Sequence, residues 1–167
     1  QNLIRALGEM EYQSPTKIQE LVIKPFLDHV DIVGQAQTGT GKTAAFALPL
    51  LEQFHNYGKY PQVLVLTPTR ELAMQVADSF RAYAAGHPHL KVLAVYGGAD
   101  FRTQINTLRK GVEIIVGTPG RVMDHMRQKT LNTSEVKCLV LDEADEMLRM
   151  GFIDDVEWIL DQLPDQR

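Results

Sequence analysis

The residues best suited to chemistry form a glycine-rich segment at positions 36–43, Ala-Gln-Thr-Gly-Thr-Gly-Lys-Thr. An apolar run at residues 31–34 precedes it and a helical run at residues 44–48 follows, so we expect a strand, a loop and a helix in that order. Such a loop directs backbone N–H groups toward one point, where the helix N-terminus adds partial positive charge. This predicts a polyphosphate site, with Lys42 reaching the β and γ phosphates and Thr43 binding Mg²⁺.

The match to the phosphate-loop pattern is incomplete, because that pattern has glycine where this chain has Ala36. A glycine-rich turn ahead of an ordinary helix is the alternative interpretation. The combination of Gly39, Gly41, Lys42 and Thr43 favours the phosphate site.

Two adjacent carboxylates, Asp142 and Glu143, follow the apolar run at residues 139–141. Phosphate-loop NTPases hold Mg²⁺ with a carboxylate in this position, often through water. Glu143 is suited to orient a water molecule toward the γ-phosphate, so one acid would serve the metal and the other the nucleophile. The alternative is a pair of exposed acids at a helix N-terminus, where they complement the helix dipole.

Gln19 ends the segment Pro-Thr-Lys-Ile-Gln at residues 15–19, in which Pro15 suits the first turn of a helix capped by Ser14. Two interpretations of Gln19 stay open. It completes a capping box with Thr16, or it presents its amide to the N6 and N7 edge of adenine.

Composition predicts one globular domain. The chain has 167 residues, 44% of them hydrophobic and 23% charged, which is ordinary for a domain with its own core. No apolar run is long enough to cross a membrane. The single cysteine, Cys138, fits a reducing, cytoplasmic compartment, and its apolar neighbours predict a buried position.

The net charge of −4 does not exclude a nucleic-acid partner. Residues 142–167 contain nine acidic and two basic residues, whereas residues 1–141 contain 12 acidic and 15 basic residues. The C-terminal stretch sets the net charge, so a basic face elsewhere is compatible with it.

Strand and helix patterns alternate along the rest of the chain. Expected strands cover residues 63–66, 92–96, 113–117 and 138–141, and expected helices lie around residues 15–26, 71–83, 105–108, 122–126 and 153–163. This alternation predicts an α/β fold, a parallel β-sheet with helices on both faces. Ligands bind at the carboxyl ends of such strands, so the segments after them are expected to face one edge.

Six ordered segments resemble the motifs of DEAD-box ATP-dependent RNA helicases. Asp-Glu-Ala-Asp at residues 142–145 is the family signature, and residues 36–43 resemble motif I, in which the family itself carries alanine first. The remaining resemblances are to the Q motif at residues 15–19, motif Ia at 68–73, the GG motif at 97–98 and motif Ib at 118–121.

The resemblance implies that residues 1–167 form a RecA-like P-loop domain, the first of two in a longer protein, which binds ATP and Mg²⁺. It implies that Glu143 is the catalytic base, with Lys42 and Asp142 also in the catalytic set, and that Thr43 and Asp142 serve the metal. The implied nucleotide-binding residues are Gln19, which recognises adenine, and Ala36, Gln37, Thr38, Gly39, Thr40, Gly41, Lys42 and Thr43. The implied RNA-binding residues are Pro68, Thr69, Arg70, Gly97, Gly98, Thr118, Gly120 and Arg121.

The residue types in the RNA-binding motifs agree with that implication. Helix N-termini, glycine backbones and two arginines suit phosphates, and no aromatic residue stands among these motifs to stack on bases. We therefore expect binding to the backbone of single-stranded RNA, independent of base sequence, coupled by ATP hydrolysis to duplex unwinding or remodelling. For Arg70 and Arg121 taken singly, a solvated surface charge is the alternative.

The chain also departs from the family pattern. Glu11 and Tyr12 stand where the family has glycine and phenylalanine, so only the aromatic is kept. Motif III and the second RecA-like domain, with its arginine finger, are missing, so the isolated chain is expected to be nearly inactive.

Three other functions remain open from sequence alone. One is an ATP-gated RNA clamp with little turnover, although intact Lys42, Asp142 and Glu143 favour the enzyme. A P-loop kinase or GTPase is the second, and Gln19 favours adenine over guanine. The third is a DNA substrate, since the 2′-OH contacts that select RNA are not visible in a sequence.

Overall fold

The computed structural model describes residues 7–8, 12–53 and 58–165. Backbone contacts group the chain into two compact units, Gln1–Asn56 with Ser79–His89, and Tyr57–Asp78 with Leu90–Arg167. Glu11, one of the departures from the family pattern, lies outside the described residues.

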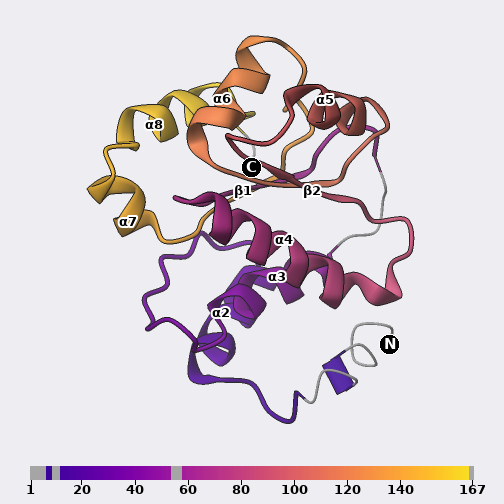
Figure 1. Cartoon of the computed structure of the whole chain (residues 1–167). Coiled ribbons are helices and arrows are strands. Elements are labelled where there is room, and N and C mark those ends of the chain that lie inside the picture. Colours follow the sequence, from indigo (N-terminus) through magenta and orange to yellow (C-terminus); the bar gives the residue numbers. More distant parts are fainter. Residues whose placement is uncertain (1–6, 9–11, 54–57, 166–167) are drawn as a thin grey trace. The chain divides into compact units, whose positions relative to one another are not determined.

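Four parallel strands form the sheet of the second unit, in the order β2-β3-β1-β4 (Figure 1). Their bounds are β1 (Val63–Leu66), β2 (Val92–Val95), β3 (Ile114–Gly117) and β4 (Cys138–Leu141). The predicted parallel sheet is confirmed. The strands expected at residues 92–96 and 113–117 are each one residue shorter than predicted.

Helices connect these strands and follow the last one. The connecting helices are α4 (Arg70–Tyr83), α5 (Phe101–Arg109) and α6 (Pro119–Arg127), with a short 3₁₀ turn, η1 (Ala84–Gly86), after α4, and β4 is followed by α7 (Ala144–Arg149) and α8 (Ile153–Asp161). In Figure 1, α5, α6 and α8 lie on one side of the strands, and α4 begins on the other. The α/β fold with helices on both faces is therefore confirmed for this unit.

The two central strands are buried along their whole length, which explains their unbroken apolar sequences. On one face, Leu64 and Ile115 belong to a core cluster that includes Leu108 of α5, Val122 of α6 and Ile159 of α8. Alternate strand residues point to the opposite face and are buried as well. Full burial of each such side chain is worth about 1.5–3 kcal/mol, so both faces hold the sheet in place.

Burial is lower on β2 and β4, which are the edge strands among the described residues. Cys138 was expected to be buried, and it is only partly so. The reason is its strand, since β4 pairs with β1 on one side and with no described strand on the other.

In the first unit, α2 (Lys17–Leu27) packs against α3 (Lys42–Glu52). The N-cap of α2 is Thr16, so the prediction of Ser14 is wrong by two residues. The physical reason is the Gln19 side chain, whose Oε1 accepts the Thr16 backbone N–H at 2.9 Å and so sets where the helix begins.

Tyr12, the aromatic residue kept from the family pattern, is held in the same unit. Its ring meets Tyr83 edge to face, and the two hydroxyl oxygens lie 3.0 Å apart. Burial, followed by this hydrogen bond, raises the pKa of Tyr83. Tyr83 therefore stays un-ionised at physiological pH, and its contact with Tyr12 holds the segment that enters α2.

The apolar run at residues 31–34 does not form a strand, so that prediction is wrong. Val33 is fully exposed, and no described strand pairs with this run. A strand needs the hydrogen bonds of a neighbour, which apolar character alone does not supply. The glycine-rich loop therefore follows an irregular segment, although the helix expected after it is present.

Gly117 and Gly120 allow a matched test of the packing between β3 and α6. A Cβ at Gly117 would lie 2.6 Å from Val122 Cγ2 and 2.7 Å from the Val95 carbonyl oxygen, whereas a Cβ at Gly120 would meet nothing within 4 Å. We expect Gly117→Ala to lower the free energy of unfolding by about 1–3 kcal/mol. Gly120→Ala should leave it unchanged or raise it by up to about 1 kcal/mol. Urea unfolding of both variants tests this, and an equal loss in both would contradict the packing described here.

Candidate functional site

The glycine-rich loop has a backbone shaped for close approach of an anion. Gly39 and Gly41 adopt φ values of 79° and 84°, in the left-handed region that favours glycine. The Thr40 hydroxyl donates to the Gln37 carbonyl oxygen at 2.6 Å and closes the turn. Lys42 begins α3, whose first turn contains no acidic residue. The partial positive charge of this helix end is therefore not neutralised locally.

Gln19 ties this loop to the start of α2. It is 2% exposed, and while its Oε1 accepts from the Thr16 backbone, its Nε2 donates to the Gly41 carbonyl oxygen at 3.2 Å. The Thr16 hydroxyl donates to the Thr40 carbonyl oxygen at 2.8 Å. The capping interpretation of Gln19 is thus confirmed. Its adenine contact stays a prediction, and it requires the amide to change partners.

The other predicted nucleotide-binding residues differ in accessibility. Gln37 and Thr38 are exposed, whereas Ala36, Lys42 and Thr43 are half-buried. The Lys42 ammonium has no hydrogen-bond or ion-pair partner among the residues that the structure describes. A cation without a partner beside an open helix N-terminus suits a polyphosphate.

In the second unit, the four strands end level with one another. The register aligns Val95, Gly117, Leu66 and Leu141 across the sheet. Just beyond the last paired residues, one further backbone hydrogen bond joins each pair of neighbouring strands. These bonds run from Thr67 N–H to Gly117 O, from Thr118 N–H to Val95 O and from Asp142 N–H to Leu66 O, at 2.9, 3.0 and 2.9 Å. The prediction that the segments after these strands share one edge is confirmed for this unit.

Asp142 and Glu143 follow β4 at this edge, and they differ in burial and in backbone conformation. Asp142 is 9% exposed, so the alternative of two exposed helix-capping acids does not fit. Glu143 has φ 53° and ψ 49°, a left-handed conformation that is uncommon for a residue with a Cβ. Such conformations cost about 1–3 kcal/mol and gather at functional sites. The next two acids, Asp145 and Glu146, are paired with Arg149.

Motif Ia and the GG motif meet in space. A Cβ on Gly98, which has φ 86°, would lie 3.6 Å from Arg70 Nη1. The Arg70 side chain is 55% exposed and its Nε lies 3.3 Å from Glu71 Oε1. Pro68 is buried, and the Thr69 hydroxyl accepts the Leu72 N–H at 3.2 Å to cap α4. Arg70 therefore presents an accessible charge beside a glycine backbone.

The GG loop is anchored where it enters α5. Asp100 is the N-cap of that helix, and its Oδ2 accepts from the Thr103 backbone N–H at 2.8 Å and from the Thr103 hydroxyl at 2.6 Å. These bonds stabilise the carboxylate and lower the pKa of Asp100. Gly97 and Gly98 remain exposed just before it.

Arg121 does not carry a solvated surface charge, so that alternative is wrong. Its side chain is 15% exposed, and Nη1 donates to the Ala99 carbonyl oxygen and to Gln104 Oε1, both at 3.1 Å. Its guanidinium carbon lies 5.2 Å from the ring centroid of Phe101. Thr118 caps the same helix without a side-chain cap bond, and Gly120 is exposed.

Sequence reasoning missed Gln104 and His125, which are buried beside Arg121. A signal was present for Gln104, because it shares the apolar face of α5 with Phe101, Ile105 and Leu108 at helical spacing. A polar residue on such a face must find a buried partner. The partner could not be named from the sequence, because His125 lies on another helix.

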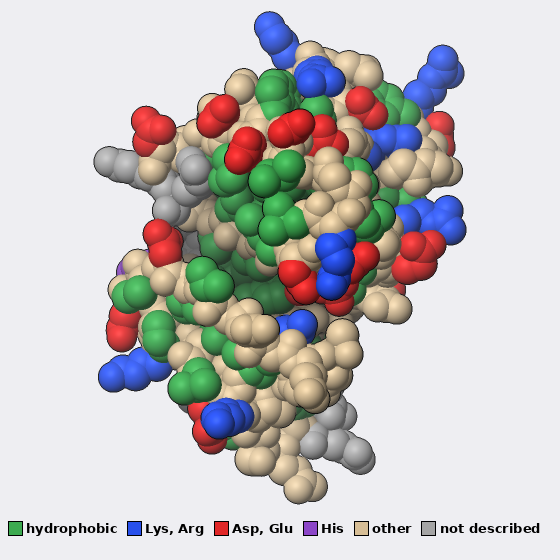
Figure 2. All heavy atoms as spheres, turned by 90° about the vertical axis from the view of Figure 1, so that its left-hand side faces the viewer, with side chains coloured by type: hydrophobic (Ala, Val, Ile, Leu, Met, Phe, Trp, Pro, Cys, Tyr) green, Lys and Arg blue, Asp and Glu red, His purple; other side chains and the backbone are tan. Residues whose placement is uncertain are grey.

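Acidic side chains gather over α7 and α8, as Figure 2 shows. Leu148 of α7, Met150 just after α7 and Ile153 of α8 are exposed there as well. The excess of acidic residues in the chain therefore lies on these helices, and this face would repel an RNA backbone.

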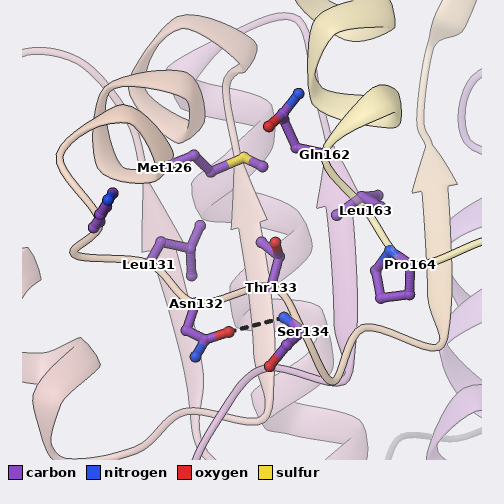
Figure 3. A pocket seen from close by; sticks show the side chains of 9 residues that line it. Met126, Leu131, Asn132, Thr133, Ser134, Gln162, Leu163 and Pro164 are labelled. Atoms are coloured by element: carbon purple, nitrogen blue, oxygen red, sulfur yellow. Dashed lines mark hydrogen bonds between the residues drawn. The ribbon is translucent and has the colours of Figure 1, made fainter.

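A pocket of about 570 Å³ lies elsewhere in the second unit (Figure 3). It is lined by the last turn of α6 and by residues after α6 and after α8, namely Met126, Lys129, Leu131, Asn132, Thr133, Ser134, Gln162, Leu163 and Pro164. Asn132 Oδ1 accepts the Ser134 N–H at 2.9 Å there. Part of its lining, residues 131–134, comes just before β4 in the chain, so the pocket lies away from the carboxyl edge. None of the predicted site residues lines it.

Two further properties concern the part of the chain that the structure describes. It contains no group of three or more His, Cys, Asp or Glu side chains arranged to hold a metal ion. No helix in it is long and apolar enough to span a bilayer.

Comparison with known proteins gives consistent matches. The model of the DEAD/DEAH box helicase family matches residues 16–167. The chain is 53% identical over 165 residues to the ATP-dependent RNA helicase DeaD of Mycobacterium tuberculosis, covering 99% of this chain and 29% of that protein. It is 50% identical to DeaD of Escherichia coli K12, covering 98% and 26%. The chain thus spans less than a third of these relatives.

A solved structure shows the same fold. A DEAD box protein from the hyperthermophile Methanococcus jannaschii superposes with a TM-score of 0.93 at 47% identity, covering 99% of this chain and 45% of that one.

His125 predicts how stability depends on pH. Burial lowers its pKa from 6.5 to about 4, the Arg121 charge adds to the shift, and Asp124 opposes it. Below about pH 6.5 the His125 side chain binds a proton in the unfolded chain, whereas in the folded chain it stays neutral until the pH is near 4. The contribution of His125 to the free energy of unfolding is therefore constant above that pH and falls as the pH drops toward 4, by at most about 1.4 kcal/mol per pH unit.

Urea unfolding at about pH 7, 6 and 5 measures this dependence. Because His125→Gln removes the titrating group, we expect a shallower decline in that variant over the same range. Parallel profiles in the two proteins would contradict a buried neutral imidazole.

Proposed function

Because this chain belongs to the DEAD/DEAH box helicase family, we propose that it is the first RecA-like domain of an ATP-dependent RNA helicase. In this proposal the chain binds ATP with Mg²⁺ and the backbone of single-stranded RNA. A second RecA-like domain of the same protein completes both sites. Hydrolysis of ATP is coupled to unwinding or remodelling of RNA duplexes.

The observation that carries the nucleotide assignment is the glycine-rich loop. Two left-handed glycines, an open helix N-terminus and an unpartnered Lys42 ammonium together favour phosphate oxygens. Ala36, Gln37, Thr38, Gly39, Thr40 and Gly41 supply backbone around the phosphates, and Gln19 recognises adenine. Because Gln19 Nε2 also donates to the Gly41 carbonyl oxygen, binding of the amide to adenine would change how the glycine-rich loop is held.

For the metal, we propose Thr43 and Asp142. A hydroxyl and a carboxylate are ligands that Mg²⁺ accepts, and it takes most of its remaining ligands from phosphates and water. The lack of a metal cluster among the described residues agrees with that pattern. Bound Mg²⁺ would neutralise charge on the phosphates.

Glu143 is proposed as the base that accepts a proton from the attacking water. It follows a buried strand at the edge where ligands of parallel sheets bind. Its left-handed backbone supports this role, because the fold maintains a conformation that costs free energy. Lys42 assists by offsetting charge at the β and γ phosphates.

For RNA, we propose contacts from the three loops after β1, β2 and β3. Arg70 supplies an accessible charge, and Thr69, Gly97, Gly98, Thr118 and Gly120 supply backbone or hydroxyl groups, with Pro68 fixing the turn. These groups suit phosphates and sugars, so binding is independent of base sequence.

Lys42→Ala tests the phosphate site. The substitution removes the main countercharge to the β and γ phosphates, so we expect ADP·Mg²⁺ binding to fall below detection in calorimetry. Lys24→Ala, which removes an exposed lysine from α2 in the same unit, is the matched control and should bind as the wild type does. Unchanged affinity in Lys42→Ala would refute the phosphate-loop assignment.

Glu143→Gln tests the catalytic base and separates an enzyme from an ATP-gated clamp. In a protein that includes the second domain, we expect nucleotide and RNA binding to persist while ATP turnover falls about 10²-fold or more, because an amide cannot accept the proton. Glu146→Gln, three residues later in α7, should keep turnover. Phosphate release measures both, and near wild-type turnover in Glu143→Gln would rule out Glu143 as the base.

A further inference from the structure

Gln104 is the centre of a buried polar cluster behind two of the proposed RNA-binding loops. The residue lies on α5 and is 4% exposed. Its Nε2 donates to the Tyr96 carbonyl oxygen at 3.2 Å. Its Oε1 accepts from Arg121 Nη1 at 3.1 Å and contacts His125 Nε2 at 2.7 Å. Every polar atom of the amide is therefore engaged inside the protein.

The donor and acceptor roles in this cluster follow from chemistry. A guanidinium can only donate, and the Tyr96 carbonyl can only accept, so the Gln104 amide has a single workable orientation. Its oxygen faces His125, and the Nε2 of that imidazole must therefore carry the proton. His125 Nδ1 is then an acceptor, 2.8 Å from the Thr130 hydroxyl.

The Thr130 hydroxyl has two acceptors within reach, His125 Nδ1 at 2.8 Å and the His125 carbonyl oxygen at 3.0 Å, which share its single proton. The carbonyl oxygen also accepts the backbone N–H groups of Thr130 and Leu131 at 2.9 and 3.2 Å, so it has partners when the hydroxyl donates to Nδ1. Phe101 stacks on the imidazole with ring centroids 4.2 Å apart and 13° between planes. A neutral, oriented imidazole thus holds the Gln104 oxygen in place.

The cluster connects segments that are distant in sequence. Tyr96 and Ala99 flank Gly97 and Gly98, and both of their carbonyl oxygens are held, one by Gln104 and one by Arg121. Arg121 lies in the first turn of α6, next to Thr118 and Gly120. Gln104 therefore links the GG loop to the start of α6.

We propose that Gln104, oriented by His125, is a positioning residue that keeps the GG loop and the start of α6 in register for one RNA backbone. This rests on the proposed RNA-binding function of those loops. In this arrangement Arg121 contributes by its hydrogen bonds to the Ala99 carbonyl oxygen and to Gln104 Oε1, which hold the GG loop. The accessible charge at this edge is that of Arg70.

Gln104→Leu tests the proposal, because it keeps volume and removes the amide. Affinity is measured by fluorescence anisotropy with two labelled RNA oligonucleotides, one of uridines only and one of mixed sequence, in the presence of a non-hydrolysable ATP analogue and Mg²⁺. The protein is the full-length helicase. We expect Kd for both RNAs to rise about three- to tenfold, with affinity for the analogue unchanged.

The salt dependence separates positioning from direct contact. Gln104→Leu removes no charge, so the slope of log Kd against log salt concentration should equal that of the wild type. Arg70→Ala should reduce this slope by about one, because it loses a phosphate contact. A shallower slope in Gln104→Leu would overturn the proposal, as would RNA affinity equal to that of the wild type.

Two further variants control for stability. Leu108→Ala removes a buried side chain one turn later on α5, outside the cluster, and should lower the melting temperature while leaving RNA affinity unchanged. Gln104→Glu keeps acceptor oxygens for Arg121 and His125, but it replaces the donor to Tyr96 with a carboxylate oxygen and adds a negative charge beside Arg121. We expect it to retain more RNA affinity than Gln104→Leu, and it gives the answer if that variant fails to fold.

The result also distinguishes the proposal from its premise. If the wild type binds neither RNA, the proposed function fails. If the wild type binds RNA and Leu108→Ala loses affinity as much as Gln104→Leu does, the function stands and the positioning role is refuted.

Discussion

The hydrogen-bond register of the parallel sheet is the constraint on which the carboxyl edge depends. A slip of one residue would exchange the two faces of a strand, and in β1 and β3 both faces are buried. Because the register brings Leu66, Val95, Gly117 and Leu141 level, the loops after them start from fixed points. The positions of Asp142 and Arg70 along this edge are therefore set by main-chain pairing, and the loops need only aim their side chains.

The glycine-rich loop is positioned by different means. No strand leads into it, and its described attachments are side-chain bonds from Thr16 and Gln19 to the carbonyl oxygens of Thr40 and Gly41. Individual bonds of this kind contribute only about 0.5–1.5 kcal/mol each. The loop is thus held more weakly than the sheet edge, which suits a segment that must adapt to bound phosphates.

Sequence patterns predicted most of the fold because the central strands are apolar on both faces and the helices are amphipathic. They failed at residues 31–34, where apolar character was present and a pairing partner was not. Pro15, as a first-turn residue, predicts Ser14 as the cap, whereas the hydrogen bond from the Thr16 backbone N–H to Gln19 Oε1 makes Thr16 the cap. For the site, the sequence correctly placed the motifs that follow β1, β2, β3 and β4, whereas no strand precedes the glycine-rich loop. It missed the cluster around Gln104, because contacts between residues on two helices depend on how those helices pack.

The position of β4 at one edge of the described sheet has a consequence for handling this polypeptide. Among the described residues no strand pairs with its outer side, and Leu141 at its end is 38% exposed. Strand edges that no other part of a chain covers pair readily with strands of other molecules. Where β4 is uncovered, concentrated preparations would form oligomers by edge-to-edge association while the helices remain intact. Light scattering would reveal such association before circular dichroism registered any change, and dilute samples would behave best.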